Sequence, residues 1–312
     1  MKILPSLVIT VFAATAATAA AQEAQHQHPA PEKLGRVHFE TSCTPDAAPA
    51  FDRAVALLHS FSFSTANKAF ESVLASDPSC AIAYWGLAMT HWGNPFGGIK
   101  SGPLLERGRL AAERGLATGS PTPRERAYIA AVGELYKNHQ TIDHRTRTLG
   151  YERAMAQLHA TYPGDREAAA FYALSVNQTA LPTDKTYANQ LKAAGILEAL
   201  FAADPEHPGM AHYIIHAFDH PPLADRALQA ARRYATIAPS APHALHMPSH
   251  TFTRVGSWQE SIDTNIASAA SAVRDGTFAE ALHAMDYQVY AYLQTAQDAA
   301  ARKVVDDAPK VL

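Results

Sequence analysis

The apolar and polar residues of this chain form helix-length segments that are separated by proline and glycine. Proline ends a helix because it has no amide hydrogen to donate and its ring clashes with the preceding turn. No segment shows the strict alternation of apolar and polar residues that is typical of a half-buried strand. The pattern therefore predicts an all-α protein, with breaks at Asp77-Pro78, Pro163-Gly164, Asp204-Pro205, Pro221-Pro222 and Gly256.

Some of these breaks recur at a regular interval. Pro205 and Pro239 are 34 residues apart, and an alanine precedes each by twelve residues, at Ala193 and Ala227. A small residue lets two helices cross closely, and the proline then stops the second helix. The interval therefore predicts a repeated pair of helices.

The same spacing is found near the start of the helical region, with Ala66, Phe70 and Pro78 in the order A-x3-F…P. This ending is typical of the tetratricopeptide repeat, which the chain resembles over about residues 46–310. The stretches 77–89 and 207–258 also look like a histidine-rich subgroup of exported bacterial repeat proteins. The resemblance implies an α-solenoid of about seven antiparallel helix hairpins, a TPR-like superhelix, over 50–79, 80–118, 123–163, 165–204, 207–239, 242–275 and 279–308.

The N-terminus has the layout of a secretory signal peptide. Met1-Lys2 is followed by a mostly apolar stretch and by small residues that end at Ala21. We expect residues 1–21 to be a signal peptide cleaved near Ala21, 22–45 a flexible lead-in, and 46–312 the helical repeat domain. An uncleaved membrane anchor is the alternative. No later apolar stretch is long enough to span a membrane. The mature protein is thus expected to be periplasmic or secreted.

Export changes the interpretation of Cys43 and Cys80, which are the two cysteines of the chain. They flank the first expected hairpin, whose helices would bring them together, and an oxidising compartment favours a disulfide. Two buried free thiols are the alternative.

Composition excludes some classes of partner and points to one kind of chemistry. The net charge is −3 over 312 residues, which does not favour nucleic-acid binding. Histidine is unusually common, with 16 residues, and half of these lie between His207 and His283.

The spacing of these histidines is regular. His212 and His216 are four residues apart, as are His246 and His250, so each pair lies on one helical face. The two pairs are also offset by 34 residues, which places them at equivalent positions of successive repeats. In the repeat family that the chain resembles, these positions face the concave groove. The resemblance therefore implies that the four imidazoles converge in one cluster on the concave face.

Imidazole is the commonest metal ligand in proteins and suits copper, zinc and iron. We expect a transition metal at this cluster, with His243 and His283 as further ligands. Asp219 and Asp286 are expected as further ligands or as acceptors that orient the imidazoles. Because a metal binds neutral imidazole, affinity should weaken below about pH 6.5. Buried structural histidines, or a polar groove without metal, are the alternatives.

Other residues carry weaker signals. The sequence His212-Tyr-Ile-Ile-His216 lacks the glutamate of the HExxH metalloprotease motif. His59 and His91 are expected in the core or at the groove edge, and His26 and His28 are expected to be solvated. The function predicted from the sequence is metal handling or metal-dependent catalysis in an exported solenoid. The alternative is a metal-free scaffold that binds a peptide or protein in its concave groove.

Overall fold

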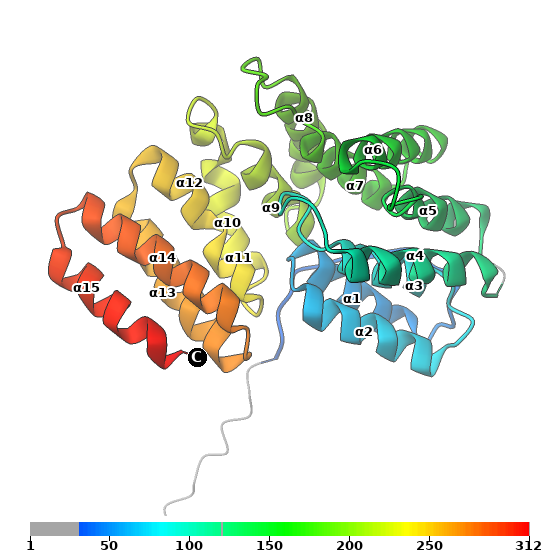
Figure 1. The fold of residues 1–312 in the computed structure, drawn as a ribbon, viewed down its shortest axis with the longest axis horizontal. Helices are drawn as coiled ribbons and strands as arrows, with labels where there is room; N and C mark the ends of the chain where they lie inside the picture. Colours follow the sequence, from blue (N-terminus) through cyan, green and yellow to red (C-terminus); the bar gives the residue numbers. More distant parts are fainter. Residues whose placement is uncertain (1–30, 120, 312) are drawn as a thin grey trace, which may run out of the picture. The chain divides into compact units, whose positions relative to one another are not determined.

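The computed structural model describes residues 31–119 and 121–311, and over these ranges the only regular secondary structure is helical (Figure 1). The prediction of an all-α protein is confirmed. All of the helices belong to one unit, Lys33–Leu312. The expected signal peptide at 1–21, and His26 and His28, lie outside the described residues.

Helices in the first part of the unit pack against their neighbours in the chain, so that α1 contacts α2, α3 contacts α4, α5 contacts α6 and α7 contacts α8. Their bounds are α1 Ala48–His59, α2 Phe63–Ser76, α3 Ile82–Trp92, α4 Gly102–Ala117, α5 Pro123–Glu134, α6 His144–Thr161, α7 Arg166–Gln178 and α8 Ala188–Ala203.

The second part contains the histidine-rich segments. Here α9 contacts α10, α12 contacts α13 and α14 contacts α15. The bounds are α9 Pro208–Ala217, η1 Ala224–Ala227, α10 Leu228–Ile237, α11 Pro242–His246, α12 Pro248–Val255, α13 Trp258–Arg274, α14 Phe278–Gln294, α15 Asp298–Asp307 and η2 Ala308–Lys310.

Close helix crossings depend on small residues, as the sequence pattern predicts. A Cβ atom at Gly86 on α3 would lie 2.4 Å from the ring of Phe70 on α2. Phe70 and Ala66 are fully buried at this crossing. The glycine thus allows the phenylalanine ring to fill the space between the two helices.

The segment that carries His243, His246 and His250 is divided into two short helices, where the sequence analysis expects one. Pro248 begins α12 and has no amide hydrogen, so the hydrogen-bond ladder is interrupted there. Met247, between α11 and α12, nevertheless has helical φ and ψ values of −53° and −34°. His246 and His250 therefore remain on nearly the same face.

Residues 33–45 differ from the expected flexible lead-in. Leu34 and Phe39 are buried in the core. The amide of Phe39 donates to Asp52, and Ser42 donates to Glu125 through both its amide and its hydroxyl. These contacts hold the segment along the helices, and a flexible lead-in is therefore wrong for this part of it.

One helix contact joins distant parts of the chain. α1 packs against α9, in addition to its contacts with α2 and α3. In an open solenoid each repeat contacts only its neighbours. The α1–α9 contact therefore brings the first hairpin against a histidine-bearing helix.

Cys43 and Cys80 form a disulfide, as predicted. The bond links the segment before α1 to the turn before α3. None of the described helices has the length and apolar character that crossing a membrane requires.

Candidate metal centre

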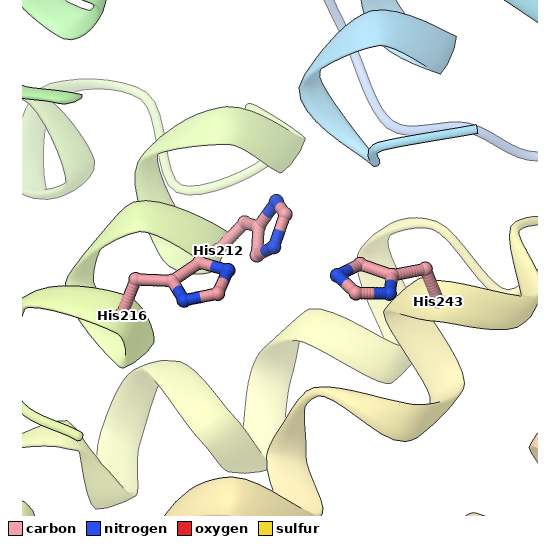
Figure 2. A group of neighbouring side chains, drawn as sticks. All are labelled: His212, His216 and His243. Carbon is pink, nitrogen blue, oxygen red and sulfur yellow. The ribbon is translucent and has the colours of Figure 1, made fainter. Parts of the chain in front are cut away.

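Three histidines from two helices form the group that we call triad one. His212 and His216 lie on α9, and His243 lies on α11 (Figure 2). One ring nitrogen of each lies within 4.8 Å of the corresponding atoms of the other two. Figure 2 shows the rings from the two helices pointing toward one another. Three nitrogen donors at this spacing could bind one metal ion.

In each histidine of triad one, the Nε2 atom has no hydrogen-bond partner among the described residues. Nδ1 of His212 donates to the backbone oxygen of His59 at 2.6 Å, so its Nε2 carries no proton while the ring is neutral. Nε2 of His212, His216 and His243 is in each case buried, without a hydrogen-bond partner in residues 31–119 and 121–311. Buried polar atoms are normally hydrogen-bonded, so three such atoms at one place indicate a bound ligand, and the lone pair on Nε2 of His212 favours a cation.

A second group, which we call triad two, consists of His246, His250 and His283. These residues lie on α11, α12 and α14, and one ring nitrogen of each again lies within 4.8 Å of the others. His246 is buried, whereas His283 is exposed. The second triad is therefore nearer to the solvent than the first.

Hydrogen bonds orient two of the rings in triad two. Nδ1 of His246 donates to Oδ1 of Asn265 at 2.7 Å, and Nδ1 of His250 donates to the Asp219 carboxylate at 2.8 Å. Asn265 must present its oxygen, because its side-chain nitrogen donates to the backbone of Ser261. Acceptors of this kind set the tautomer of metal-binding histidines.

With both Nδ1 atoms protonated, the Nε2 atoms of His246 and His250 present lone pairs to each other across 3.0 Å. Two lone pairs at this distance repel each other unless a proton or a metal ion lies between them or beside them. The arrangement therefore favours a cation at triad two as well.

An aromatic ring covers each triad. The Phe61 ring contacts all three histidines of triad one, with centroid separations of 4.4, 5.5 and 5.5 Å. The Tyr287 ring contacts all three histidines of triad two, at 4.8, 5.0 and 5.2 Å. Phe61 has a φ of 52°, a left-handed conformation that is costly for a bulky residue. Such strain is found at functional sites.

Burial favours the neutral form of His212, His216, His243 and His246. It lowers the pKa of His212 to about 3, and the neighbouring histidines contribute to this shift. Burial and the other histidines also lower the pKa of His216, His243 and His246 well below the ordinary value. Neutral imidazole is the form that binds metal ions.

The predicted site residues are thus grouped differently from the single cluster of four. Each pair of histidines four residues apart lies within one triad, and His243 and His283 complete the triads. Asp219 accepts hydrogen bonds from His250 and from Arg254, so its carboxylate orients the His250 ring. Asp286 is exposed and belongs to neither triad.

A buried group behind triad one is not predicted by the sequence pattern. His59 and His207 each donate through Nε2 to the carboxylate of Glu167 at 2.8 Å, and the Tyr213 hydroxyl donates to His59 at 2.9 Å. Burial alone would raise the pKa of Glu167, but the two histidines outweigh it and lower the pKa. No local spacing along the chain links these residues.

Two histidines with weaker sequence signals lie outside the triads. His59 lies in the core, which is one of its two expected positions, and His91 is half-buried.

A pocket of about 530 Å³ borders both triads and is called the site pocket below. His216 of triad one and His250 of triad two both line it, together with loop residues after α3 and α7. A larger depression of about 770 Å³ lies near Lys100 and Arg147 and contains no triad residue. The site pocket could therefore give a small molecule access to the histidines.

Comparison with known proteins adds no family assignment. No family model matches the chain, and no curated protein matches it.

Proposed function

We propose that this protein binds transition-metal ions, of copper, zinc or iron, through triad one and triad two. The observation that carries the proposal is the convergence of three histidines in triad one, each of which has a buried, unpartnered Nε2 atom. Leaving a buried acceptor without a partner costs about 1–3 kcal/mol, so three together need a compensating ligand. A metal ion would satisfy all three atoms at once.

The ligand chemistry supports a site with an open coordination position. Structural zinc sites use four protein ligands, whereas catalytic sites use three and leave one position for water or substrate. Each triad offers three imidazoles. This count favours a metal-dependent enzyme or a metal-handling protein over a purely structural ion.

The setting of the site is part of the proposal. We propose an exported TPR-like α-solenoid, with the helices paired over the seven ranges expected from the sequence and with the first hairpin also packed against α9. The Cys43–Cys80 disulfide supports an oxidising compartment, since such bonds persist there. A metal-free peptide-binding scaffold has less support, because the three Nε2 atoms of triad one are buried and a peptide lying in a surface groove would not reach them.

The test is the metal content of the protein purified from its native compartment, followed by reconstitution of metal-free protein. We expect bound copper, zinc or iron to survive dialysis. The double variant His216→Ala/His250→Ala removes one ligand from each triad and should abolish retention while the helical circular dichroism signal remains. His139→Gln is the matched control, since this histidine lies outside both triads. Equal metal uptake by the double variant and the control would overturn the proposal.

A further inference from the structure

The two triads lie against each other. The rings of His216 and His250, which belong to different triads, have centroids 6.2 Å apart. The rings of His243 and His246 are 6.0 Å apart and are both carried by α11. In proteins that bind two metal ions together, the ions are about 3.5–4 Å apart, and imidazole nitrogen binds at about 2.0–2.1 Å. Rings this close can bind ions that share a bridging ligand.

The site pocket reaches both triads at the same place. His216 of triad one and His250 of triad two both line this pocket, and their ring centroids are 6.2 Å apart. The other walls are both apolar and polar, and include Phe96, Leu181 and Gln178. Phe96 lies over the His216 ring with a centroid separation of 4.6 Å. A volume of about 530 Å³ is that of a small-molecule pocket.

The charge balance of the site indicates which kind of ligand the pocket would bind. The six imidazoles are neutral ligands, so two divalent ions would bring four positive charges into a half-buried site. Among the described residues, the carboxylate that contacts the triads is Asp219, and it already accepts from His250 and Arg254. Uncompensated charge is costly in a poorly solvated environment. An anionic oxygen donor at the open positions would reduce that cost.

We propose that triad one and triad two form one dinuclear metal centre, an inference that rests on the proposed function. Its open positions take a small carboxylate or phenolate ligand from the site pocket. The two ions act together because their ligands face one pocket, and the flat apolar body of the ligand lies against Phe96 and Leu181.

Copper stoichiometry and electron paramagnetic resonance test the dinuclear centre. Metal-free protein is loaded with Cu(II), dialysed and analysed for copper, and the resonance signal is integrated. We expect two copper ions per chain, with a signal that integrates to well under two spins because neighbouring ions couple. His243→Ala in triad one and His283→Ala in triad two should each retain one copper with a full, uncoupled signal.

The outcomes separate the two proposals. Two copper ions with two full, independent spins would support metal binding by the triads but overturn the dinuclear centre. A single copper ion in the native sequence, lost in both single variants, would overturn it too. No retained copper, zinc or iron would overturn the proposed function itself.

Benzoate, a carboxylate on a flat apolar body, is the probe for the site pocket. We expect benzoate to shift the visible spectrum of the copper-loaded protein in a saturable titration. Leu181→Trp fills the pocket without touching a metal ligand and should weaken benzoate binding by about tenfold or more, which corresponds to about 1.4 kcal/mol, while copper stoichiometry stays at two. Leu191→Trp, exposed on α8 and outside the pocket, is the control. An unchanged spectrum, or equal binding by both tryptophan variants, would overturn the assignment of the pocket.

Discussion

Nδ1 of His212 donates a hydrogen bond to the backbone oxygen of His59 at 2.6 Å, and this bond joins α9 to the end of α1. The His59 side chain is itself held by Glu167 and Tyr213. The orientation of His212 therefore depends on a buried network that involves two other helices, α1 and α7. The buried network around His59 therefore helps to position triad one, in addition to the helices that carry its histidines.

Gly209 is the point at which this network is most sensitive to a small change. A Cβ atom there would lie 2.3 Å from Nδ1 of His59. We expect Gly209→Ala to displace His59, to destabilise the fold by about 1–3 kcal/mol and to weaken metal binding at triad one. Denaturant unfolding and metal titration measure these effects. Gly195→Ala on α8 is the control, because no atom lies within 4 Å of its added Cβ. Equal stability of the two variants would contradict this prediction.

Asp219 is expected to affect triad two through His250. Removal of the carboxylate in Asp219→Ala frees the His250 ring to rotate, and loss of an orienting acceptor typically costs about 10–100-fold in metal affinity. Competition with a chelator of known affinity measures the change. Asp263→Ala, on the surface of α13, should leave affinity unaltered. An unchanged metal affinity of triad two in the Asp219 variant, measured against the same chelator, would contradict this role of Asp219.

The metal-free protein should lose stability in acid. The pKa of His212 is lowered to about 3 in the folded protein by burial, and the pKa of His216, His243 and His246 also lies well below the ordinary value of 6.5. The unfolded chain takes up more protons than the folded one below about pH 6.5, so the free energy of unfolding falls as pH decreases through that value.

We therefore expect the melting temperature of metal-free protein to drop between pH 7.5 and pH 5. Bound metal should raise it at both values, because the ion binds only the folded arrangement. Differential scanning calorimetry at several pH values, with and without metal, makes the comparison. A melting temperature that is constant from pH 7.5 to pH 5 would show that the histidines are not buried in their neutral form.

The disulfide between Cys43 and Cys80 closes a loop with a sequence separation of 37 residues. Cross-linking a loop of this length restricts the unfolded chain and stabilises the fold by about 3–4 kcal/mol. We expect the double variant Cys43→Ser/Cys80→Ser to lose that much in denaturant unfolding. Intact-mass analysis of unreduced protein should find no thiol that can be alkylated. Two alkylated thiols would rule out the bond in solution.

Local patterns in the sequence predict a large part of this molecule. Proline and glycine breaks indicate helix ends, because proline cannot donate in the helix ladder. The spacing of His212 from His216, and of His246 from His250, places each pair on one face, because residues four apart in a helix are neighbours. Export and the position of the cysteines predict the disulfide.

Tertiary structure decides how these pieces combine. His243 joins the pair on α9, and His283 joins His246 and His250, because packing of α11 and α14 brings residues from other turns into reach. No spacing along the chain relates Glu167 to His59 or His207, nor Phe61 to triad one. The residues that orient and cover the metal ligands meet only through contacts between distant helices, and side-chain packing rather than helical periodicity selects them.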